Sequence, residues 1–172
     1  MASNEDRLPS VTHYVIARCD PAKLGATKLN KVLWFADVIY YRRHGRTITG
    51  VDNYVKQQFG PVQRNMLGVL EKLKKEGKIA ERPSDTPVGI RREYVWLEEP
   101  TLAPFAGDEV DLLNEVMDWI CNGESAKSIS DKSHDVLWEE TEIGAAMPVA
   151  AGAVVPAEIT AEAVEWAKSA FA

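Results

Sequence analysis

The chain has 172 residues, of which 45% are hydrophobic and 27% charged, and its net charge is −6. It is long enough to bury roughly 70% of its unfolded surface, and its globular composition excludes a disordered, collagen-like or coiled-coil protein. No window is apolar enough to span a membrane, and residues 1–10 lack the pattern of a signal peptide, so we expect a soluble cytoplasmic protein that has no contact with a membrane.

The first predicted elements are two helices. Residues 8–19 form a short apolar run in which Pro9 and Ser10 suit a helix start, and the Asp20-Pro21 pair predicts its end. The strongest helical pattern covers residues 28–43, with Thr27 as a possible cap. Its apolar residues recur at helical spacing and predict the centre of the core: Leu29, Val32, Leu33, Ala36, Ile39 and Tyr40.

A loop or short strand, a third helix and a hairpin follow. Residues 46–59 are rich in β-branched residues and glycine. Gly60-Pro61 predicts a helix start, because proline fits the first helical turn, and an apolar stripe then continues to Lys75. Residues 78–97 predict a β-hairpin, since two strand-like halves flank a turn rich in proline and glycine.

The remaining segments are mostly helical. Residues 108–120 predict a helix whose acidic first turn, including Glu109, we interpret as a solvated face. Residues 125–140 predict one or two short helices, residues 145–156 a buried strand or a loop, and residues 159–171 a last helix. We therefore expect one α+β domain over residues 1–172. It is mainly α-helical, with a winged-helix-like core, a β-hairpin and a C-terminal helical extension over residues 151–172.

Groups that could support catalysis are scattered. His13, His44 and His134 lie far apart in sequence, and Cys19 and Cys121 lack metal-ligand spacing and are expected to be buried thiols. A Cys121 and His134 nucleophile pair oriented by Asp135 is the weaker alternative. Glycine-rich nucleotide loops and calcium-binding loops are absent from the sequence. We expect no enzymatic activity, no catalytic residue, no cofactor and no metal.

The charge distribution leaves DNA binding open. Residues 1–97 carry 17 Lys and Arg against 10 Asp and Glu, whereas residues 98–172 carry 3 against 16. These charges are either solvated faces or surfaces that dock on each other or on a partner. A helix over residues 61–75 could read DNA, with Arg91 and Arg92 on the wing; the candidate contacts on that helix are Gln63, Arg64, Asn65, Lys72 and Lys75. A winged-helix transcriptional regulator is therefore an alternative, although the whole chain is acidic.

Residues 28–77 resemble the Panacea domain, the SocA-like antitoxin family. Residues 128–138, SISDKSHDVLW, resemble the Ser/His and tryptophan signature near the family's C-terminus. The resemblance extends over about residues 10–150. The motifs that carry it in residues 28–77 are Lys28-Leu29-Asn30-Lys31, His44-Gly45-Arg46, and Tyr54 followed by Phe59-Gly60-Pro61-Val62.

The resemblance implies an antitoxin of a bacterial or phage type II toxin–antitoxin system, of the kind used in phage defence. It would neutralise a cognate protein toxin, encoded by a neighbouring gene, through direct binding. One group of the family instead acts as an adaptor that delivers its toxin to a cytoplasmic protease, which is a further alternative. The resemblance points to seven candidate partner-binding residues: Asp37, Tyr54, Gln58, Gly60, Pro61, His134 and Trp138.

Each candidate also has a structural interpretation. Gly60 and Pro61 would set a turn and start a helix. His134 and Trp138, four residues apart, would stack as a local pair. Asp37 would form an ion pair with a buried basic group such as Lys31. Tyr54 and Gln58 are the strongest contact candidates, because loops carry binding residues and aromatic side chains make good anchors.

Overall fold

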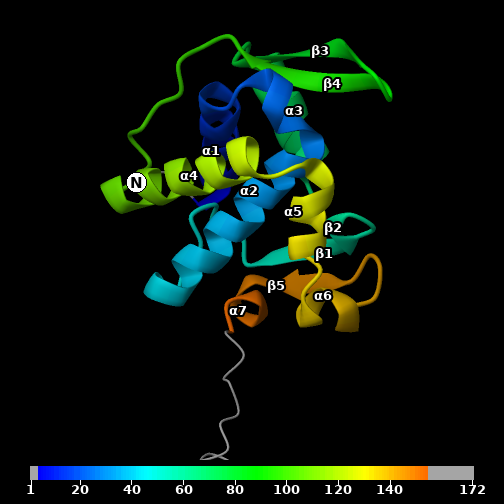
Figure 1. Cartoon of the computed structure of the whole chain (residues 1–172). Coiled ribbons are helices and arrows are strands. Elements are labelled where there is room, and N and C mark those ends of the chain that lie inside the picture. Colours follow the sequence, from blue (N-terminus) through cyan, green and yellow to red (C-terminus); the bar gives the residue numbers. More distant parts are fainter. Residues whose placement is uncertain (1–3, 155–172) are drawn as a thin grey trace, which may run out of the picture.

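The computed structural model describes residues 4–154. It is a mainly helical α+β fold, as predicted (Figure 1). Its elements in chain order are α1 (Asn4–Arg18), α2 (Pro21–His44), β1 (Asn53–Gln57), β2 (Gly60–Val62), α3 (Met66–Lys75), β3 (Ile79–Thr86), β4 (Gly89–Trp96), α4 (Gly107–Met117), the π-helical turn η1 (Asp118–Asn122), α5 (Ala126–Lys132), α6 (Val136–Glu140), β5 (Ala146–Pro148) and α7 (Val149–Gly152).

Helix α2 forms the centre of the core, which confirms the prediction for this segment. Leu29, Val32 and Leu33 are completely buried. Helices α1, α4, α5 and α7 and strands β2 and β4 all pack against α2, which runs through the middle of the molecule (Figure 1). The apolar face that the sequence places on this helix therefore meets apolar partners along most of its length.

Helix α1 starts earlier than predicted, and an additional helical turn precedes the predicted second helix. Helix α1 begins at Asn4, and Pro9 lies inside it, where it removes only one backbone hydrogen bond near the helix start. Helix α2 begins at Pro21, and the carboxylate of Asp20 caps it by accepting a hydrogen bond from the Ala22 amide at 2.9 Å. The helix is broken at Gly25, whose φ is 62°. The part of α2 after this break begins at residue 26, within two residues of the predicted start at Lys28, and the turn before the break was not predicted.

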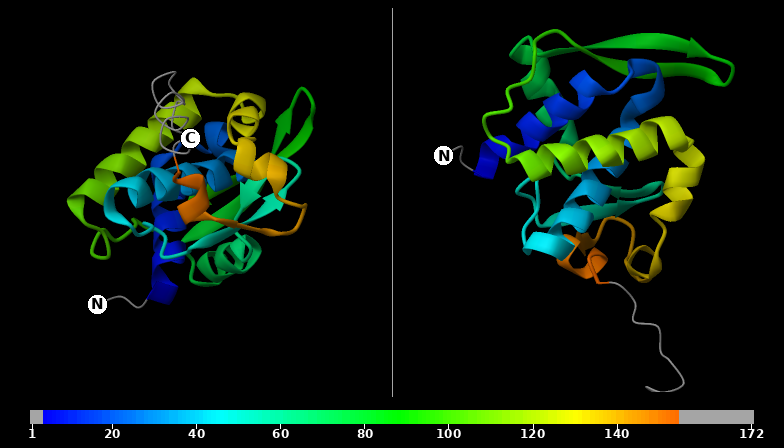
Figure 2. Two further views of the ribbon diagram at one scale, coloured as in Figure 1. Left: turned by 90° about the horizontal axis from the view of Figure 1, so that it is seen from below. Right: turned by 60° about the vertical axis from the view of Figure 1, so that its left-hand side comes forward.

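Two small antiparallel sheets lie on opposite sides of the helices (Figures 1 and 2). One has the strand order β2-β1-β5. The other is the predicted hairpin, in which β3 and β4 pair from Ile79 opposite Trp96 to Thr86 opposite Gly89. Its turn contains only Pro87 and Val88, so the strands extend further into the turn than the sequence indicates.

The predicted helix start at Pro61 is wrong. Gly60 and Pro61 belong to β2, where Pro61 lies opposite Lys56, and α3 begins only at Met66. Strand β2 is at the sheet edge, and an edge strand tolerates proline because it need not donate a hydrogen bond on its free side. The proposed DNA-reading residues Gln63 and Arg64 therefore precede the helix, and the winged-helix arrangement stays a prediction.

The C-terminal predictions are largely confirmed within the described range. Residues 108–120 are helical, ending in the π-helical turn η1. Residues 125–140 form two short helices, and Ala146–Pro148 is a strand that pairs with β1, placing Tyr54 opposite Met147. The last predicted helix, residues 159–171, lies outside the described residues. Between residues 4 and 154, no helix combines the length and the apolar character needed to cross a membrane.

Candidate functional site

Three motifs that are far apart in the sequence meet where α2, β2 and the end of α5 come together. Lys31 comes from α2, Gly60 from β2, and Ser133 follows α5. A Cβ atom added to Gly60 would lie 2.0 Å from Lys31 Nζ and 2.4 Å from Ser133 Oγ. Gly60 also has a φ of 110°, which side chains rarely adopt. Only glycine fits at this position without displacing its neighbours.

Lys31 is the unusual group in this cluster. Its side chain is 1% exposed, and the described residues give Nζ neither a hydrogen bond nor an ion pair. Burial lowers the pKa of the Lys31 ammonium to about 8, because the charged form loses its hydration. The sequence did not single out Lys31 as a site residue, although it belongs to a motif that carries the family resemblance.

Asp37 does not pair with Lys31, so that prediction is wrong. Its Oδ1 accepts hydrogen bonds from the amides of Ile48 at 2.8 Å and Thr49 at 3.0 Å. Its Oδ2 accepts hydrogen bonds from the hydroxyls of Thr49 at 2.5 Å and Tyr54 at 2.8 Å. Burial raises the pKa of Asp37 to about 6, and these hydrogen bonds oppose the rise. Asp37 thus anchors the loop after α2 to the helix.

Tyr54 is buried rather than exposed. Its side chain is 0% exposed, and its ring packs edge-on against Trp34 with the centroids 5.0 Å apart. The expectation that Tyr54 lies on a loop and is available to a partner is wrong, because Tyr54 lies in β1, the central strand of the three-stranded sheet, and its hydroxyl reaches Asp37 on α2. Pro61 is buried as well.

His134 and Trp138 form the predicted stacked pair. Their ring centroids are 3.6 Å apart and the rings are inclined by 9°. Trp138 Nε1 donates a hydrogen bond to the carbonyl oxygen of Gln57 at 3.2 Å, and Lys56 Nζ lies 3.9 Å from the centroid of the Trp138 ring. Burial, and then repulsion by Lys31, lower the pKa of His134. The stack therefore ties α6 to the β1–β2 hairpin.

The turn between β1 and β2 is the part of these motifs that faces solvent. Gln58 is exposed, as expected, and the adjacent Phe59 is 61% exposed. We did not predict Phe59 as a contact residue, although it is part of the Phe59-Gly60-Pro61-Val62 motif. An exposed phenylalanine held on a short turn by a buried glycine and proline is a favourable anchor for a protein partner.

Glu109 differs from its predicted surroundings, whereas the two cysteines do not. Glu109 is 1% exposed and forms ion pairs with Arg7 at 2.8 Å and Arg46 at 2.6 Å, so its assignment to a solvated face is wrong. Cys19 and Cys121 are buried free thiols, as predicted, and their sulfur atoms lie 3.1 Å apart. A hydrogen bond with the Cys19 thiol lowers the pKa of Cys121. The structure thus brings Cys121 to Cys19, and no hydrogen bond joins it to His134 within residues 4–154.

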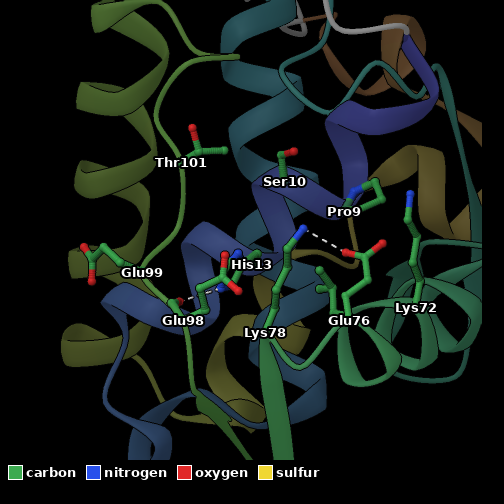
Figure 3. Close-up of a pocket in the computed structure, with 10 residues that line it drawn as sticks. Pro9, Ser10, His13, Lys72, Glu76, Lys78, Glu98, Glu99 and Thr101 are labelled. Carbon is green, nitrogen blue, oxygen red and sulfur yellow. Dashed lines mark hydrogen bonds and ion pairs between the residues drawn. The ribbon is translucent and has the colours of Figure 1, made fainter.

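A cavity of about 280 Å³ lies between α1, the end of α3 and the segment that follows β4 (Figure 3). His13 Nε2 donates a hydrogen bond to the carbonyl oxygen of Glu98 at 2.9 Å, and burial lowers the pKa of His13. Lys78 pairs with Glu76 at 2.8 Å. Because lysines and glutamates alternate around the cavity, its lining favours no single charge of ligand. Among the described residues, no cluster of His, Cys, Asp or Glu could hold a metal ion.

The fold and the motif cluster define a mainly helical α+β domain built around a buried lysine, glycine and serine, with an exposed aromatic turn beside them. The family model described as "Antitoxin SocA-like, Panacea domain" matches residues 29–139, which is more than half of the chain. The protein belongs to this family. No curated protein and no solved structure matches it significantly.

Proposed function

We propose that this protein is the antitoxin of a bacterial or phage type II toxin–antitoxin system and neutralises a cognate protein toxin by binding it directly. The observation that carries this proposal is its membership of the SocA-like antitoxin family over residues 29–139. Neutralisation by binding needs no chemical step on the antitoxin. It requires a preformed surface that covers the active site of the toxin or holds the toxin in an inactive shape.

The turn at Gln58 and Phe59 is the proposed centre of that surface. Phe59 is the exposed residue of a motif in which the adjacent Gly60 lies against Lys31 and Ser133. The backbone that carries it is held on one side by pairing with β1 and on the other by Trp138. A rigidly held aromatic side chain loses little conformational entropy on binding, which favours affinity.

The experiment is co-expression of the protein with the toxin-like product of a neighbouring gene, followed by pull-down and titration of the purified pair. Phe59→Ala and Gln58→Ala should weaken toxin binding by about 1 kcal/mol or more. Both side chains are exposed, so the melting temperature should change little. Leu102→Ala is the matched control, because Leu102 is 47% exposed on the segment before α4, away from the turn.

If the antitoxin inhibits the toxin only while it is bound to it, neutralisation should saturate at one antitoxin per toxin. Growth rescue without a detectable complex, or rescue by far less antitoxin than toxin, would contradict inhibition by stoichiometric binding. Such a result would favour delivery of the toxin to a cytoplasmic protease or an enzymatic activity. Tight, sequence-specific binding of the isolated protein to its own promoter at physiological salt would instead favour a transcriptional regulator.

A further inference from the structure

A second cavity, of about 480 Å³, lies where the N-terminal part of α2 faces strand β4. Its volume is in the range of small-molecule sites. Unlike the cavity of Figure 3, it has no acidic lining residue. Its lining includes four cationic side chains: Lys23, Lys28, Arg91 and Arg92. Arg91 pairs with Glu93 at 2.9 Å and Arg92 with Glu81 at 3.1 Å, whereas the two lysines form no ion pair within the described residues.

The backbone of α2 adds to the positive character of this cavity. The helix breaks at Gly25, where φ is 62° and ψ is 169°, and continues to His44. Residues 26–28, the first turn after the break, line the cavity. The first amides of a helix have no carbonyl partner one turn earlier, and the helix dipole makes this end positive. Such an end binds anionic groups, phosphates above all.

Arg91 lines the cavity with a side chain that is 37% exposed, and one of its donor groups has no acceptor among the described residues. Its Nη2 donates hydrogen bonds to the carbonyl oxygen of Ala22 at 2.5 Å and to Glu93 at 2.9 Å. Its Nε is buried and has no hydrogen-bond partner in the part of the chain that the structure describes. A buried donor without an acceptor is unfavourable. Lys28 Nζ is also only weakly engaged, since its acceptor, the Cys121 carbonyl oxygen, lies 3.4 Å away.

Apart from Thr27, the rest of the cavity wall is largely apolar. Leu24, Ala26 and Tyr94 line it, and Leu24 and Tyr94 are almost completely buried. The combination of a cationic rim, a helix N-terminus and an apolar wall with an aromatic ring suits a ligand that has both a phosphate and a flat organic part. We propose that this cavity binds a small phosphorylated ligand, of the class of nucleoside diphosphates and triphosphates.

A nucleic acid backbone carries the same phosphate chemistry, but the surroundings of the cavity favour a small ligand. Strands β3 and β4 and their turn, residues 79–96, contain three acidic and three basic residues. Arg82 is the one basic residue of the hairpin outside the cavity lining, and it lies 3.1 Å from Glu93. The row of cations therefore does not continue along the hairpin beyond the cavity, as the binding of a nucleic acid backbone would require.

The test is isothermal titration calorimetry of the full chain at low salt, and it requires no toxin. ATP and inorganic pyrophosphate should each bind at one site per chain, and adenosine should bind at least ten-fold more weakly than ATP. Lys28→Gln and Arg92→Gln should each weaken ATP binding about ten-fold, because each removes one cation from the cavity. Lys75→Gln, an exposed lysine on α3, is the matched control and should leave the affinity unchanged.

Folding of the two variants is checked by their melting temperatures, which should stay close to that of the wild type. Arg92 is 77% exposed and its ion pair contributes little to stability. Three results would overturn the proposal: no binding of ATP or pyrophosphate up to about 1 mM, equal affinity for adenosine and ATP, or unchanged ATP affinity in both variants. Tighter binding of a DNA duplex than of ATP, with a steep dependence on salt, would assign the surface to nucleic acid instead.

Discussion

Replacing Gly60 by alanine tests the packing of the three motifs against one another. The added Cβ would lie 2.0 Å from Lys31 Nζ and 2.4 Å from Ser133 Oγ, so both side chains must move although both are buried. Such overpacking costs about 1–3 kcal/mol. The φ of 110° adds about 1–2 kcal/mol of backbone strain for a residue with a side chain. We expect Gly60→Ala to lower the free energy of unfolding by about 2–5 kcal/mol.

Urea unfolding followed by circular dichroism measures this loss, and a thermal melt should show a midpoint lowered by about 4–20 °C. Gly77→Ala is the matched control, since Gly77 has a φ of 70° but no atom within 4 Å of its added Cβ. It should show only the backbone strain, about 1–2 kcal/mol. Lys31→Met removes the amine nearest to the new methyl group and should recover part of the stability of Gly60→Ala. A Gly60→Ala variant as stable as Gly77→Ala would refute the close packing.

Three further predictions concern buried polar groups. Tyr54→Phe should lower the free energy of unfolding by about 1–2 kcal/mol in urea titrations, because the Asp37 carboxylate loses a buried donor; an unchanged midpoint would contradict the hydrogen bond. Since burial raises the pKa of Asp37 from 3.8 to about 6, its contribution to stability is complete below about pH 4 and is lost as the pH rises through 6. Asp37→Asn should remove this slope from unfolding midpoints measured between these pH values. Diamide should oxidise Cys19 and Cys121 to an intramolecular disulfide with the loss of two hydrogen atoms, detected by mass spectrometry of the unfolded chain and absent in Cys121→Ser.

The elements of this protein that depend on local patterns could be predicted from the sequence. The apolar spacing over residues 28–43 indicates a buried helix, and turn residues indicate the hairpin over residues 78–97. The stacking of His134 on Trp138 follows from their spacing of four residues. Each of these features is encoded within a few consecutive turns or strand residues, where helical periodicity and turn chemistry act directly.

The features that only the tertiary structure decided depend on contacts between distant segments. Pro61 suits a helix start by itself, but pairing with β1 places it in an edge strand. By its residue type and position in the sequence, Tyr54 suits a surface contact. In the structure β1 is the central strand of a sheet, and the Tyr54 hydroxyl donates a hydrogen bond to Asp37. Lys31, Gly60 and Ser133 are far apart along the chain, and no local pattern can bring them together. Burial and strand pairing depend on the whole fold, which is why the sequence identified the motifs but not the cluster that they form.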